Sequence, residues 1–218
     1  MNDAFAQLAM LGSSLVLITS FLLLWRRGTP AHVSALAIQS IALGATAGLV
    51  GYFADKHELY LVAVLLIALK GVGIPVLLHR MARRLGPARH VPPYVNTATS
   101  LLAGALLVLL AYVVMRPLVE ASPLPTRAGM PLAMGVVFVS LFVIVSRRHA
   151  LAQVIGFLML ENGIALLAVL GTYGIPLIVE IGVFLDAMMG FLVMQIVVYH
   201  IHQTFQSLDV EQLNRLRR

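Results

Sequence analysis

The sequence predicts an all-α polytopic membrane protein, a bundle of about seven transmembrane helices. Of its 218 residues, 60% are hydrophobic and only 11% are charged, whereas about a quarter of a soluble domain is charged. So few charges cannot cover a water-facing surface, and this excludes a soluble globular domain. The apolar residues also gather in runs of about twenty, the length that a helix needs to cross a bilayer.

Seven apolar runs follow one another, and most are separated by charged, Gly or Pro residues. The first run opens with Met-Asn-Asp and lacks the basic segment of a secretory signal, so we expect it to remain as a span. Prolines cluster after the fourth run, which predicts an external segment that is not helical throughout. The expected spans are 3–25, 31–53, 58–79, 95–115, 130–146, 149–171 and 175–199.

The loops divide these spans into units. Residues 1–94 are expected to form an N-terminal three-helix membrane unit, and residues 95–129 a linking helix with a Pro-rich external loop. Residues 130–203 are expected to form a C-terminal three-helix unit, and residues 204–218 a cytoplasmic tail. Arg26-Arg27 and Arg147-Arg148 follow the first helix of each three-helix unit, so a parallel internal repeat is one reading of the chain. That repeat would bring Gln39 into register with Glu161 to within about one residue.

The basic residues set the orientation. Alternate loops and the tail carry eleven of the fifteen: Arg26, Arg27, Arg80, Arg83, Arg84, Arg89, Arg147, Arg148, Arg215, Arg217 and Arg218. The opposite side has only Lys56, Arg116 and Arg127. Because cytoplasmic loops collect Lys and Arg, the pattern predicts an external N-terminus and a cytoplasmic C-terminus.

Four ionisable side chains lie inside the apolar runs and dominate the functional reading. Glu161, Asp186 and Lys70 fall near mid-membrane, while Glu180 lies nearer the outer end of the last span. Each costs about 2.5–3.5 kcal/mol at a helix centre, so such groups usually face a bundle interior, a partner or a water-filled path. Together with Asn162 they are candidates for a proton path. Static ion pairing, for example of Lys70 with Glu161 or Asp186, is the structural alternative.

Several kinds of site are not expected. The chain has no cysteine, so it offers no thiolate for an iron–sulfur cluster or for nickel and no cysteine nucleophile. Its seven histidines lie at span ends rather than at mid-membrane depth. We therefore expect no catalytic residue, bound cofactor or metal in this chain alone. The basic excess is spread over loops as in a membrane protein, which argues for the lipid bilayer and against nucleic acid as its partner.

Three stretches of the chain form a recognisable set: Ser146-Arg-Arg-His-Ala-Leu-Ala-Gln-Val-Ile-Gly-Phe-Leu-Met-Leu-Glu161-Asn-Gly, Ile178-Val-Glu-Ile-Gly-Val-Phe-Leu-Asp186-Ala and Ser207-Leu-Asp-Val-Glu-Gln-Leu. Together they resemble the hydrogenase-4 component E family. The C-terminal helices of that family are similar to the K subunit of respiratory complex I and the C subunit of multi-subunit cation/proton antiporters. Where the complex I subunit has a first glutamate, this chain has Leu158, and Glu161 follows one turn later on nearly the same face. Asp186 corresponds roughly to the second acid of that subunit.

The resemblance implies a non-catalytic membrane subunit of a complex-I-like, energy-converting hydrogenase, such as a formate hydrogenlyase, in a bacterial or archaeal cytoplasmic membrane. Its partners would be antiporter-like and H-subunit-like membrane subunits, together with peripheral hydrogenase subunits that carry the nickel–iron and iron–sulfur centres. Two alternatives remain open at this point. The chain could serve a cation/proton antiporter without a redox partner, or be a scaffold whose buried charges only pair with neighbouring subunits.

Overall fold

The computed structural model describes residues 2–26, 28–84, 95–147 and 150–172, and these residues form helices without any strand. The elements are α1 (Asn2–Trp25), α2 (Thr29–Phe53), α3 (Glu58–Leu65), η1 (Leu66–Gly73), α4 (Ile74–Arg84), α5 (Thr97–Ala121), η2 (Pro125–Gly129), α6 (Met130–Ser146) and α7 (Ala150–Thr172). The all-α prediction is therefore confirmed.

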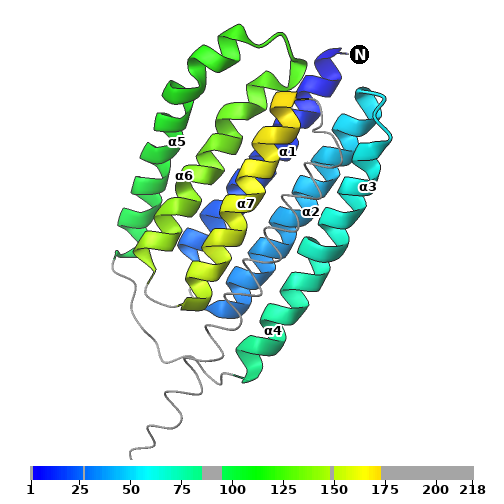
Figure 1. The fold of residues 1–218 in the computed structure, drawn as a ribbon. Coiled ribbons are helices and arrows are strands. Elements are labelled where there is room, and N and C mark those ends of the chain that lie inside the picture. Colours follow the sequence, from blue (N-terminus) through cyan, green and yellow to red (C-terminus); the bar gives the residue numbers. More distant parts are fainter. Residues whose placement is uncertain (1, 27, 85–94, 148–149, 173–218) are drawn as a thin grey trace, which may run out of the picture. The chain divides into compact units, whose positions relative to one another are not determined.

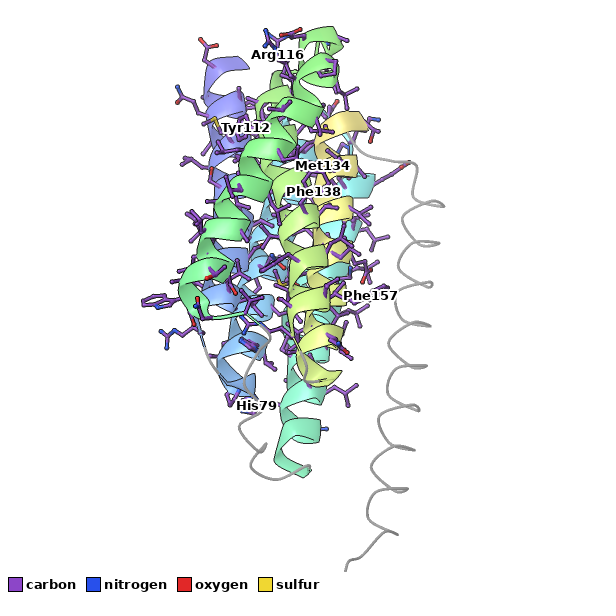
Figure 2. The ribbon with its side chains drawn as sticks, turned by 90° about the vertical axis from the view of Figure 1, so that its left-hand side faces the viewer. His79, Tyr112, Arg116, Met134, Phe138 and Phe157 are labelled. Atoms are coloured by element: carbon purple, nitrogen blue, oxygen red, sulfur yellow. The ribbon has the colours of Figure 1, made fainter. Side chains whose placement is uncertain are left out.

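Six stretches of the described residues are long and apolar enough to cross a membrane. They coincide with the first six expected spans, so the protein is a multi-pass membrane protein. The seventh expected span, 175–199, and the tail, 204–218, lie outside the described residues. Figure 2 shows Arg116 of α5 toward one end of the helices and His79 of α4 toward the other, as expected for residues near opposite ends of their spans.

Four helices form the centre of the described part. Helix α1 packs on α2 and α6, and α7 packs on α6 and α2, so that the long helices run side by side (Figure 1). Helix α5 flanks α6, and the α3–η1–α4 segment flanks α2. In α7, 61% of the most apolar stretch is buried among the described residues. In α5, only 22% of the corresponding stretch is buried. Much of the apolar surface of α5 is therefore not covered by the other described residues.

Helices α6 and α7 approach closely because two glycines of α7 face α6. A Cβ at Gly163 would lie 3.0 Å from both the Val137 backbone nitrogen and a Val136 methyl group. At Gly156 it would lie 3.0 Å from Val143 and Ile144 side-chain carbons. Small residues let helix backbones approach closely within a membrane, and these two glycines do so between α6 and α7.

The Pro-rich segment is not helical throughout, as expected, but its first residues belong to α5. Helix α5 continues through Pro117 to Ala121, six residues past the expected end of that span. Extended backbone then begins at Ser122, and the next turn is the 3₁₀ segment η2, which begins with Pro125. A proline inside a membrane helix is tolerated where neighbouring groups satisfy the freed carbonyl. The break in the helix therefore falls after the first proline of the cluster, not at it.

Polar contacts fix the helix ends. The Asn96 side chain accepts a hydrogen bond of 2.8 Å from the Thr99 backbone N–H and caps α5. Gly28 precedes α2 with φ 119°, a conformation that favours glycine. Arg147 served in the sequence analysis as a topology marker and as part of a possible repeat. In the structure it is buried, and its Nη2 donates to the carbonyls of Leu23 and Leu24 at the end of α1. A cation at a helix C-terminus is favourable, so Arg147 also ties α6 to α1.

Candidate functional site

A buried ion pair joins η1 to α7. Lys70 Nζ lies 2.5 Å from Glu161 Oε1, and the two residues are only 5% and 9% exposed. The other ion pair among the described residues, Arg116 with Glu120, is on the surface. Two charges taken out of water stay charged only when close pairing offsets their lost hydration, and the structure provides that pairing. Of the two acids considered as partners of Lys70, Glu161 is the one in contact.

The backbone around Lys70 is a π-helix rather than an α-helix. Element η1 covers Leu66–Gly73, and the Ile74 N–H that follows it donates to the Leu69 carbonyl, five residues back. The expected span 58–79 was a single helix, so the π-segment corrects that expectation. Hydropathy gives the length of a span but not its hydrogen-bond register, which is why the sequence did not reveal it.

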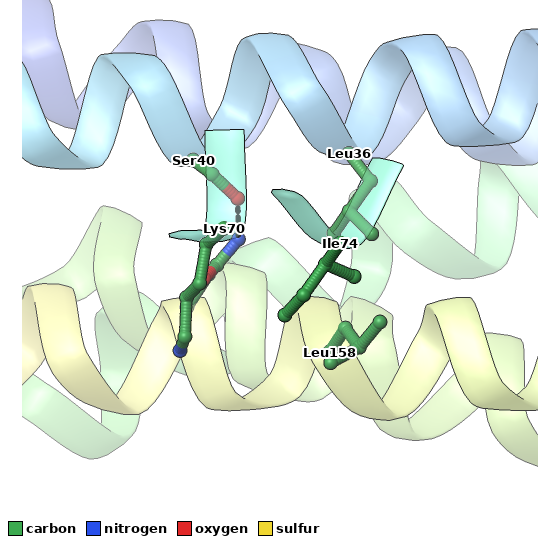
Figure 3. Close-up of a pocket in the computed structure, with 6 residues that line it drawn as sticks. Leu36, Ser40, Lys70, Ile74 and Leu158 are labelled. Atoms are coloured by element: carbon green, nitrogen blue, oxygen red, sulfur yellow. Dashed lines mark hydrogen bonds between the residues drawn. The ribbon is translucent and has the colours of Figure 1, made fainter. Parts of the chain in front are cut away.

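Apolar and polar side chains together line a small cavity next to Lys70. The cavity is lined by Leu36 and Ser40 of α2, Lys70 of η1, Ile74 of α4, and Leu158 and Asn162 of α7. Figure 3 shows Leu36, Ile74 and Leu158 grouped together to one side of Lys70. Leu158 lines the cavity from α7. It lies on the same face of α7 as Glu161, one turn away.

Asn162, the neighbour of Glu161, belongs to a buried network of amide and hydroxyl side chains. Its Nδ2 donates to Gln39 Oε1 at 3.2 Å and to Ser40 Oγ at 3.0 Å. Gln39 Nε2 in turn donates to Ser20 Oγ at 2.8 Å and to the Val16 carbonyl at 3.2 Å. Asn162 and Gln39 are both fully buried. Because the network ties α7 to α2 and α2 to α1, it fixes the part of α7 that carries Glu161.

Two buried oxygens at this site have no hydrogen-bond partner among the described residues. They are Glu161 Oε2 and Asn162 Oδ1. Buried acceptors are nearly always satisfied in folded proteins. Glu161 therefore has one oxygen held by Lys70 and a second whose lone pairs are available to a proton or to a hydrogen-bond donor.

The structure brings together three of the five candidates from the sequence. Lys70 and Glu161 are in contact, and Asn162 lines the same cavity as Lys70. Asp186 and Glu180 lie outside the described residues.

Sequence reasoning missed Ser20 and Ser40 and noted Gln39 only as part of a repeat. The sequence signal that could have revealed this network is Gln39-Ser40, an amide followed by a hydroxyl in the middle of an apolar span. The described residues contain no group of three or more His, Asp or Glu side chains placed to hold a metal ion.

Comparison with known proteins finds relatives along nearly the whole chain. The chain is 37% identical over 217 residues to an uncharacterised protein of Mycobacterium tuberculosis, Rv0085, with 99% of each chain covered. It is 25% identical over 205 residues to hydrogenase-4 component E of Escherichia coli, with 94% of this chain and 95% of the relative covered. Hydrogenase-4 component E of Shigella flexneri matches equally. No protein-family model and no solved structure matches the chain.

Proposed function

The chain belongs to the same family as Rv0085 of Mycobacterium tuberculosis, and from this and its distant similarity to hydrogenase-4 component E we propose that it is a membrane subunit of a complex-I-like, energy-converting hydrogenase. In this role it transfers no electrons itself. It contributes buried charged groups to a path along which the complex moves protons across the membrane. The formate-hydrogenlyase type is the form of complex that we propose.

The observation that carries this proposal is the Lys70–Glu161 pair. A carboxylate in an apolar surrounding is stable while the ammonium is beside it, and it takes up a proton more readily when the ammonium moves away. Glu161 Oε2, which has no partner among the described residues, is the oxygen that receives this proton. Movement of a neighbouring charge is thereby converted into proton uptake or release at one carboxyl group.

We propose that the path continues through the last span. Asp186 is expected near the middle of that span, and Glu180 nearer its outer end. Asp186→Asn keeps size and polarity but cannot cycle a proton. We therefore expect it to reduce proton translocation by the assembled complex, and Glu180→Gln to have a smaller effect.

We also propose the surroundings of the subunit, and the similarity to hydrogenase-4 component E is what supports them. The subunit resides in a bacterial or archaeal cytoplasmic membrane, next to antiporter-like and H-subunit-like membrane subunits. Peripheral hydrogenase subunits hold the nickel–iron and iron–sulfur centres. The chain itself contains no cysteine, so it supplies no thiolate ligand to such centres.

Isolation of the complex tests the class of function. Purification of the tagged, full-length protein from its native membranes in mild detergent should recover nickel–iron hydrogenase subunits in stoichiometric amounts. Recovery of a set of antiporter subunits without any redox subunit would contradict the proposal and favour the antiporter alternative. A membrane-embedded control protein with the same tag identifies non-specific partners.

A further inference from the structure

The third span changes its helix type where its only charged mid-span residue lies. Helix α3 ends at Leu65, the π-helix η1 runs from Leu66 to Gly73, and α4 begins at Ile74. π-helices make up well under 1% of residues in proteins, and where they interrupt α-helices they frequently mark functional sites. Lys70 lies within this segment, so the cause of the π-helix also bears on the position of Lys70.

Pro75 accounts for the location of the π-helix. It is buried in the first turn of α4, directly after η1. If the span were α-helical throughout, Pro75 could not donate to the Gly71 carbonyl, and its ring would collide with that oxygen. A wider turn before the proline relieves the collision, and local π adjustments are a known way for membrane helices to accommodate proline.

A second proline shows that proline alone is not sufficient. Helix α5 remains α-helical through Pro117, and the four residues before Pro117 include no glycine. Two glycines, Gly71 and Gly73, precede Pro75. Glycine lowers the preference for a regular α-helix. At Gly71 a Cβ would also lie 2.9 Å from the Ile41 side chain of α2, so glycine allows η1 to approach α2 closely.

The π register decides which way Lys70 points. Lys70 is 5% exposed, whereas its neighbour Leu69 is 37% exposed and Val72 is 53% exposed. A π turn closes its hydrogen bond over five residues instead of four. Restoring the α register would turn the side chains before Pro75, relative to those after it, by one residue position, about 100°. Lys70 would then leave the face that meets α7.

We propose that Pro75, together with Gly71, is a positioning residue that sets the π register of η1 and thereby holds Lys70 against Glu161. The inference rests on the proposed function, because it explains how one charged group of the proposed proton path is placed. Pro75 itself takes no part in proton transfer. It acts only by setting the direction in which the backbone holds the Lys70 side chain.

Crosslinking tests this register without reference to activity. The chain has no cysteine, so Lys70→Cys combined with Glu161→Cys creates a single pair of thiols in it. In native membranes containing the whole complex, a short bifunctional maleimide should link the two positions, as detected by mass spectrometry of this chain. Adding Pro75→Ala should abolish the crosslink, whereas adding Pro117→Ala, the matched proline change in α5, should leave it.

The outcomes separate this inference from the proposed function. A crosslink that persists in the Pro75→Ala background overturns the positioning role, whatever happens to proton translocation. A merely structural role of Pro75 would lower the amount of assembled protein without changing the crosslinked fraction, and that result also overturns the inference. Loss of the crosslink supports the inference. If Pro75→Ala in the otherwise native chain then leaves proton translocation unchanged, the positioning role stands and the proton path through Lys70 is contradicted.

Discussion

At the scale of single residues, the site depends on how a few polar groups are satisfied inside an apolar bundle. Lys70 and Glu161 offset each other's charge, while Asn162 and Gln39 share hydrogen bonds across three helices. Removing one partner of a buried pair typically costs about 3–5 kcal/mol, because the other charge is left alone. The amide network therefore stabilises the protein, and a change that leaves Lys70 or Glu161 without any polar partner destabilises it, in addition to any effect on proton transfer.

The amide network makes a prediction about stability. Gln39→Leu removes the acceptor of one Asn162 hydrogen bond and the donor to Ser20. We expect it to lower the free energy of unfolding by about 1–3 kcal/mol, the usual cost of leaving buried polar groups unsatisfied. Thermal unfolding of the purified protein in detergent measures this. Gln7→Leu is the matched control, because Gln7 is exposed on α1, and equal midpoints for the two variants would contradict the prediction.

At the scale of helices, the contact between α6 and α7 depends on glycine. Gly163→Ala would place a Cβ 3.0 Å from the backbone nitrogen of Val137, so the two helices must move apart. Overpacking of this kind typically costs about 1–3 kcal/mol.

Gly171→Ala provides the control on the same helix, because its Cβ would meet only the Met130 methyl group, at 3.7 Å. The melting temperature should fall for Gly163→Ala and stay close to that of the native protein for Gly171→Ala. An equal fall for both would show that loss of glycine, not crowding, is responsible.

The elements differ in how well the sequence predicts them. The apolar run 130–146 coincides with α6, and the run 149–171 differs from α7 by one residue at each end, because bilayer thickness sets both lengths. The expected span 95–115 ended before Pro117, whereas α5 runs on to Ala121, because whether a helix tolerates proline depends on neighbouring groups. The π register of η1 and the bond between Asn162 and Gln39 were also missed. Each depends on packing between helices that are distant in the sequence.

At the scale of the whole molecule, a clear prediction concerns orientation. Eleven of fifteen basic residues lie in alternate loops or the tail, so we expect the N-terminus outside and the C-terminus in the cytoplasm. Reporter fusions after residues 28, 55, 90 and 122 should alternate between cytoplasmic and external activity. A cytoplasmic reporter in the segment 118–128 would overturn the orientation, and with it the assignment of Glu180 to the outer half of the last span.

The central claim is that Glu161 carries protons, and the proton-to-turnover ratio tests it most directly. Proton uptake and hydrogen turnover are measured in inverted membrane vesicles that contain the intact complex. Both rates are normalised to the amount of assembled subunit, and the ratio of the first to the second is compared between variants. Glu161→Gln keeps an oxygen for Lys70 but cannot cycle a proton, so we predict a severalfold lower ratio with assembly retained. Glu120→Gln, the same change in the exposed pair with Arg116, should keep the native ratio. A native ratio in Glu161→Gln would contradict the proton path and leave the buried pair as a scaffold contact.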